Sequence, residues 1–79
     1  MTNKEKYDQV FIDSFGVKQE QLNSKLIYQS INEWDSVGHM SMIAGIEETF
    51  DITLDIDDIT EFSSYEEGMK ILKRYKIEF

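Results

Sequence analysis

The part of the sequence that decides the fold is residues 35–51, DSVGHMSMIAGIEETFD. Its apolar residues recur at steps of three and four, the period of a helix that buries one face. Asp35 and Ser36 are both favoured N-cap residues, so we predict a helix that begins there and ends near the last residue of the stretch. Gly38 and Gly45 lie inside it and each costs about 1 kcal/mol relative to Ala. We therefore expect close backbone approach at one or both glycines.

The residues before this helix indicate another helix and a long loop. Apolar positions spaced for one buried face predict a helix over residues 3–15, with Thr2 or Asn3 as its cap and Gly16 at its end. Residues 16–35 have no sustained period, so we predict an ordered loop with one short helical turn. We expect four aliphatic side chains to hold this loop to the core: Leu22, Leu26, Ile27 and Ile31.

The residues after the central helix predict two more helices. Residues 51–55 alternate polar and apolar, but no second strand is present to pair with them, so we expect an extended connector with Ile52 and Leu54 turned inward in part. A short helix is predicted at about 56–62. A fourth helix should follow Ser63 and Ser64, with a capping box and with a buried face of Tyr65, Met69, Leu72 and Tyr75 or Lys76. The expected fold is an all-α four-helix bundle, one domain over residues 1–79.

Charge is distributed unevenly along the chain. Lys and Arg total 8 and Asp and Glu total 16, so the net charge is −8. Residues 31–68 hold eleven of the acids and no Lys or Arg, a net of −11, whereas residues 1–30 sum to 0 and residues 69–79 to +3. Such a stretch repels nucleic acid and anionic membranes and attracts a basic protein patch. A solvated acidic surface that only keeps the protein soluble is the alternative.

Composition excludes several classes of protein. The chain has no Cys, so it offers no disulfide, no thiolate nucleophile and no Cys-based metal site. It has no apolar run long enough to span a membrane and no signal-peptide pattern, so we expect a cytoplasmic protein. We also expect a monomer. We expect its large aromatic side chains to form the core: Phe11, Phe15, Trp34, Phe50 and Phe62.

Ser36 is the residue that points most directly to chemistry. A serine at the start of a helix has free N–H groups and the positive end of the helix dipole around it, which would stabilise a phosphate on its hydroxyl. Asp35 beside it could hold a cation or contact the enzyme that delivers the phosphate. An ordinary N-cap accounts for the same two residues.

Asp35-Ser36-Val37, followed by Ile43, Glu47-Glu48 and Phe50-Asp51, resembles the acyl carrier proteins. In that family an Asp-Ser-Leu motif opens the second of four helices, and its serine carries 4′-phosphopantetheine through a phosphodiester. The resemblance covers almost the whole chain, including its length, acidity, long first loop and short third helix. It implies that Ser36 is the attachment residue, that Asp35 belongs to the cofactor site, and that the chain is a carrier and not an enzyme.

The sequence departs from the family pattern at four positions. Val37 replaces the usual Leu, Gly38 and Ser41 stand where carriers of fatty-acid synthesis are typically acidic, and Asp55 stands where Pro is frequent. The Trp-Asp-Ser-x-Gly-His string is similar to stand-alone carriers that serve specialised acyl, lipid or secondary-metabolite pathways. Fatty-acid synthesis is the alternative pathway.

The resemblance also implies partners. A phosphopantetheinyl transferase (holo-carrier synthase) would load the serine, and acyl synthases, ligases and transferases with basic patches would dock on the second and third helices. The implied contacts are Val37, Met40, Glu47, Glu48 and Asp51. Methionines at 40, 42 and 69 could line an apolar groove, and the acyl chain would be sheltered among Ile43, Ile46, Ile59 and Phe62.

Two alternatives to a carrier stay open. One is an acidic helical module that binds a basic protein without any covalent group. The other is a Ser–His hydrolase, because His39 follows Ser36 by three residues and such positions are neighbours on a helix. A hydrolase would also need a group that orients the imidazole and donors for an oxyanion. We expect no metal site, since there is a single His and the acids of residues 51–61 lack the glycine of a calcium loop.

Overall fold

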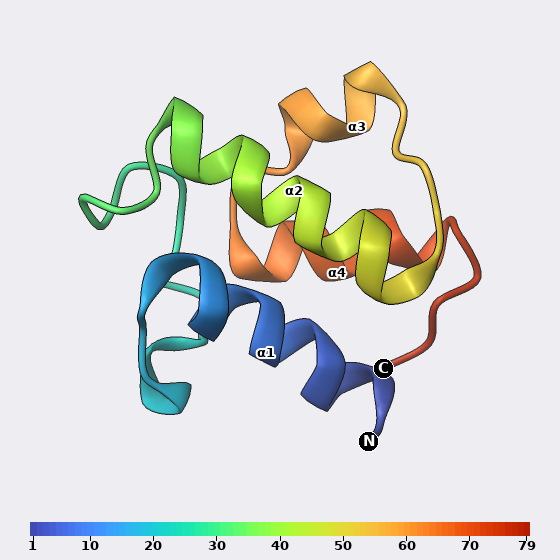
Figure 1. The fold of residues 1–79 in the computed structure, drawn as a ribbon, viewed down its shortest axis with the longest axis horizontal. Coiled ribbons are helices and arrows are strands. Elements are labelled where there is room, and N and C mark those ends of the chain that lie inside the picture. The colour runs from blue at the N-terminus through green and yellow to red at the C-terminus, as the bar shows by residue number, and fades with distance from the viewer.

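Four helices without any strand make up the protein, and the computed structural model describes all residues, 1–79 (Figure 1). The predicted all-α bundle with a long first loop and a short third helix is confirmed. The helices are α1 (Asn3–Phe15), α2 (Ser36–Phe50), α3 (Ile56–Glu61) and α4 (Tyr65–Lys73), with one 3-10 turn, η1 (Gln19–Gln21), in the long loop.

The helix ends follow the predicted capping residues. Thr2 caps α1 in a full capping box, with its Oγ1 accepting from the Glu5 N–H at 3.1 Å and the Glu5 carboxylate accepting from the Thr2 N–H at 3.0 Å. Gly16 ends α1 in the left-handed region at φ 68°. At α4 only the serine half of the box is present, because Ser64 Oγ accepts from the Glu67 N–H at 2.9 Å without the reciprocal bond.

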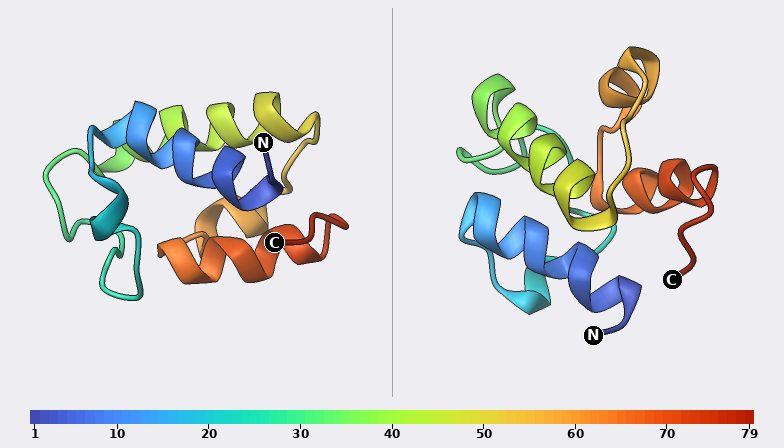
Figure 2. Two further views of the ribbon diagram at one scale, coloured as in Figure 1. Left: turned by 90° about the horizontal axis from the view of Figure 1, so that it is seen from below. Right: turned by 45° about the vertical axis from the view of Figure 1, so that its right-hand side comes forward.

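Two layers of helices enclose the core. Helices α1 and α2 lie side by side, α4 lies in a second layer beneath them, and α3 stands at the edge of α2 away from α1 (Figures 1 and 2). The residues after α4 return toward the start of α1, where the Asn3 side-chain amide donates to the Glu78 carbonyl at 3.0 Å. No helix combines the length and the apolar character needed to cross a bilayer.

Aromatic side chains dominate the core. Phe11 lies at the centre, with ring centroids 4.9 Å from Tyr7, 5.6 Å from Trp34 and 5.4 Å from Tyr65. The expected burial of Trp34, Phe11, Phe15 and Phe62 is confirmed, whereas Phe50 is only partly buried and packs on the edge of the core. On α4 the buried face also includes Gly68 and Ile71, which the predicted face left out, while Met69 and Tyr75 are partly buried.

The long loop is held by its backbone as well as by its aliphatic side chains. The Tyr28 N–H donates to the Ser63 carbonyl at 2.8 Å, and the Tyr65 N–H donates to the Leu26 carbonyl at 2.9 Å. Leu26 is buried, and Leu22 and Ile31 pack on the core in part. The prediction was wrong for Ile27, which is 48% exposed because the loop pairs with the α3–α4 connector through its backbone there.

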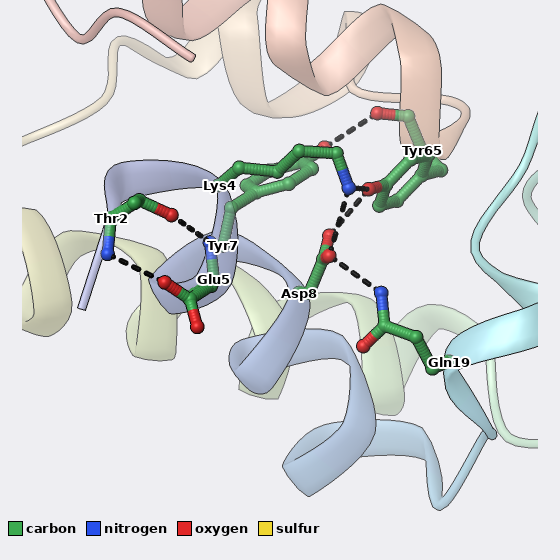
Figure 3. A network of polar contacts seen from close by, with 7 residues as sticks. All are labelled: Thr2, Lys4, Glu5, Tyr7, Asp8, Gln19 and Tyr65. Carbon is green, nitrogen blue, oxygen red and sulfur yellow. Dashed lines mark hydrogen bonds and ion pairs between the residues drawn. The ribbon is translucent and has the colours of Figure 1, made fainter.

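A buried carboxylate joins α1 to α4 and to the loop (Figure 3). Asp8 accepts hydrogen bonds from the Tyr65 hydroxyl, from Lys4 Nζ at 3.0 Å and from Gln19 Nε2 at 2.7 Å. Burial disfavours its charge, but these three donors outweigh burial and lower the pKa of Asp8. The charge is therefore fully paired, which a buried carboxylate requires.

The connector between α2 and α3 is extended, as predicted. Leu54 is buried and Ile52 is partly buried. The Leu54 N–H donates to the Glu47 carboxylate at 2.8 Å, so α2 orders the connector that leads into α3.

Candidate functional site

Ser36 is the first residue of α2, and its side chain is exposed. Asp35 is the N-cap, with its Oδ1 accepting from the Gly38 N–H at 2.8 Å. The Asp35 carbonyl accepts from the His39 N–H at 2.8 Å. The N–H groups of Ser36 and Val37 belong to the first turn, where the helix supplies no acceptor. The serine hydroxyl therefore lies in solvent at the positive end of a 15-residue helix.

Gly38 lets the loop pass directly over the first turn of α2. A Cβ at this position would overlap the Glu33 carbonyl oxygen and would lie 3.2 Å from its carbon. At Gly45 a Cβ would meet only the Val10 side chain of α1, at 3.0 Å. The expected close backbone approach is thus confirmed at Gly38, and it fixes the direction from which the chain reaches Ser36.

Trp34 and His39 flank the start of α2 and are bonded to each other. They occupy the positions before the N-cap and one turn into the helix that often carry a hydrophobic staple. The indole Nε1–H donates to His39 Nδ1 at 3.0 Å, and the two rings are nearly parallel at 14° with centroids 6.3 Å apart. His39 Nε2 lies 2.8 Å from the Ile59 carbonyl oxygen in α3. Since Nδ1 accepts and a carbonyl cannot donate, this arrangement belongs to the neutral imidazole that carries its proton on Nε2.

A groove of about 390 Å³ opens beside Ser36, between the start of α2, α3 and the loop. Its apolar part is formed by Met40, Ile59 and Phe62, and it contains no carboxylate, Lys or Arg. Hydroxyl groups and two aromatic rings complete the lining, from Tyr28, Ser36, His39, Thr60 and Ser63.

Seven apolar residues were predicted to line a groove or to shelter an acyl chain, and three of them line this groove: Met40, Ile59 and Phe62. Three others belong to the core between the helices, where each is at most 1% exposed: Met42, Ile43 and Ile46. Met69 is partly buried against the core and does not line the groove. The helical period placed Ile43 and Ile59 alike on inward faces, but it could not distinguish the groove from the core.

The residues implied as partner contacts lie on one side of the groove and farther along α2. Val37 is 78% exposed and Met40 53% exposed, and both follow Ser36 in the first turns of α2. Glu48 and Asp51 are exposed at the far end of the helix, whereas the carboxylate of Glu47 is partly buried and bonded to the Leu54 N–H. Ile56, which no sequence pattern had marked as a contact, is 80% exposed at the start of α3; the available signal was an apolar residue directly after an N-cap.

A second set of contacts holds the other side of α3. Asp58 accepts from Arg74 at 2.8 Å and from the Tyr75 hydroxyl, and the Tyr75 oxygen also accepts from the Asp55 N–H at 3.1 Å. The bond to Asp58 raises the pKa of Tyr75. Arg74 and Tyr75 follow Asp58 by 16 and 17 positions in the sequence, so no local pattern predicted these contacts.

The geometry gives no support to a Ser–His hydrolase. Both nitrogens of His39 are bonded, to Trp34 and to the Ile59 carbonyl, and neither contacts Ser36. The imidazole therefore has no free lone pair with which to take a proton from the serine hydroxyl. No three His, Asp or Glu side chains converge in a way that would hold a metal ion.

Comparison with known proteins found no matching protein family, no matching curated protein and no matching solved structure.

Proposed function

We propose that the protein is an acyl carrier, with 4′-phosphopantetheine attached to Ser36 through a phosphodiester. The observation that carries the proposal is an exposed serine hydroxyl at the N-terminus of α2, directly beside a groove of about 390 Å³. The Asp-Ser motif and the resemblance of the whole sequence to acyl carrier proteins support the same conclusion.

The residues around Ser36 fit such a group. The first-turn N–H groups of Ser36 and Val37 and the helix dipole would stabilise the phosphate, and Asp35 keeps its cap on Gly38 while they do so. The uncharged groove would receive the arm or its cargo. When bound, the group supplies a thiol that holds the acyl chain as a thioester, chemistry that a chain without Cys cannot provide itself.

Partner enzymes would dock on the surface that surrounds the groove. Its exposed apolar residues are Val37 and Met40 at the start of α2 and Ile56 at the start of α3, which are 78%, 53% and 80% exposed. Exposed acidic side chains at the far end of α2 and around the start of α3 would meet Arg and Lys of the partners: Glu48, Asp51, Asp55 and Asp57. Single exposed ion pairs contribute only about 0–1 kcal/mol, so binding should be weak, fast and sensitive to salt. Such binding suits a carrier that must be released by several enzymes in turn.

The test is the intact mass of the protein after incubation with coenzyme A and a phosphopantetheinyl transferase. We expect one added phosphopantetheine on the wild-type chain and none on Ser36→Ala. Ser41→Ala is the matched control, because Ser41 is an exposed serine on the same helix and should leave loading unchanged.

Loading of Ser36→Ala, or loss of loading in Ser41→Ala, would contradict the assignment of the attachment residue. No mass gain with a range of competent transferases would instead favour the acidic module that binds a basic protein without a covalent group. The pathway, whether specialised acyl metabolism or fatty-acid synthesis, would be identified by the mass of the acyl species loaded in the native cell.

A further inference from the structure

We infer that His39 is a positioning residue, whose neutral imidazole joins the turn before Ser36 to helix α3. The cross-link has two bonds. Nδ1 accepts from the Trp34 indole at 3.0 Å, and Nε2–H donates to the Ile59 carbonyl at 2.8 Å. One side chain thus connects the loop, α2 and α3, which are the three elements that form the groove.

The position of α3 depends on such tethers. A helix of six residues is too short to be stable by its own hydrogen bonds, so contacts with the rest of the fold must hold it. Its polar tethers are of two kinds: the bond from His39 to the Ile59 carbonyl faces α2, and the bonds from Arg74 and Tyr75 to Asp58 face the residues after α4. His39 is therefore the polar link between α3 and the helix that carries the attachment serine.

The packing around the imidazole makes this link specific to histidine. The ring is partly buried and lies among the rings of Trp34, Tyr28 and Phe62, at centroid distances of 6.3, 5.7 and 6.2 Å. Phenylalanine would fill the same space without either bond. Glutamine has both a donor and an acceptor, so it can keep part of the link.

The first test uses the wild-type chain alone and does not depend on loading. In a long-range proton–nitrogen NMR spectrum of nitrogen-15-labelled protein at neutral pH, we expect His39 as the tautomer with its proton on Nε2, and a Trp34 indole proton protected from exchange. A tautomer with its proton on Nδ1, or an indole proton that exchanges as fast as a free one, would overturn the inference.

The second test measures hydrogen exchange of the α3 amides in variants of the full chain. For His39→Phe we expect exchange at Ile59 and Phe62, whose N–H groups bond to Asp55 and Asp58, to become about three- to tenfold faster, which is the effect of one lost hydrogen bond. Trp34 should lose its indole protection, and His39→Gln should restore part of the α3 protection. Tyr28→Phe is the matched control, since it keeps the ring beside His39 and should leave α3 unchanged.

Equal exchange in His39→Phe and Tyr28→Phe would refute the link to α3. The consequence for loading rests on the proposed function: because His39 does not contact Ser36, we expect His39→Phe to load more slowly through a higher KM for the carrier, with kcat kept. A chain that shows the predicted tautomer and exchange but accepts no phosphopantetheine would refute the carrier function and leave the positioning role standing.

Discussion

Gly38 provides the sharpest test of how the chain presents Ser36. The glycine lies in the first turn of α2, where the loop backbone crosses it. In Gly38→Ala the new Cβ would overlap the Glu33 carbonyl oxygen and would lie 3.2 Å from its carbon and 3.3 Å from Asp35 Oδ1. The two Glu33 atoms are backbone atoms of the loop that leads to Ser36, so the clash with them cannot be relieved by rotating a flexible side chain.

The expected magnitude follows from two opposed effects. Alanine is favoured over glycine inside a helix by up to about 1 kcal/mol. Overpacking of a well-packed site costs about 1–3 kcal/mol, and backbone atoms place this case at the upper end. We therefore expect Gly38→Ala to lower the free energy of unfolding by about 1–2 kcal/mol, which corresponds to a fall in Tm of about 4–16 °C for a domain of this size.

Gly45→Ala is the matched control, because it gains the same helix propensity in the same helix. Its new Cβ meets only the Val10 side chain, at 3.0 Å, so we expect a stability within about 1 kcal/mol of wild type. The assay is urea unfolding of both variants, followed by circular dichroism and by the fluorescence of buried Trp34. A Gly38→Ala protein as stable as Gly45→Ala would show that the loop backbone can shift away from the new Cβ without loss of unfolding free energy. The close approach at Gly38 would then not fix the path of the chain to Ser36.

Three further predictions concern charge. Asp8→Asn should lower the free energy of unfolding by about 2 kcal/mol at neutral pH, the usual size of hydrogen bonds to a buried charge. Asp13→Asn is the control, because Asp13 is exposed and its replacement should cause no such loss. The lowered pKa of Asp8 means that its contribution to the free energy of unfolding is present above about pH 4 and disappears as the pH falls through its folded pKa. The unfolding free energies of wild type and Asp8→Asn should therefore become equal in acid. Burial, with the nearby Tyr65, raises the pKa of Tyr7 well above 10, so the folded state keeps this phenol neutral. The free energy of unfolding should therefore be unchanged up to about pH 10 and should fall above it, where the unfolded chain releases the proton. Unfolding at high pH without the absorbance change of tyrosine ionisation would contradict this. Because residues 31–68 carry a net of −11, added NaCl should raise Tm, and a flat response would mean that these charges are too dispersed to repel one another.

The sequence by itself determined the helices and their ends. The apolar period predicted α1 over residues 3–15, and Gly16 was predicted at its end. For the starts of α1 and α4 the capping signals narrowed the N-cap to two neighbouring residues each, of which the structure has Thr2 and Ser64. These signals are local, since a cap and its partner lie within four residues of each other, so one sequence is enough to find them. The position of Ser36 at the N-terminus of α2 was predicted from the same kind of local capping pattern.

Only the tertiary structure decided what surrounds Ser36. The imidazole of His39 bonds to a carbonyl 20 residues away, and Asp58 bonds to side chains 16 and 17 residues away. Helical periodicity assigned Ile43 and Ile59 alike to inward faces, yet one lies in the core and the other in the groove. Periodicity reports which side of a helix is apolar, whereas the neighbour that covers that side depends on how separate helices pack, and no local pattern contains that information.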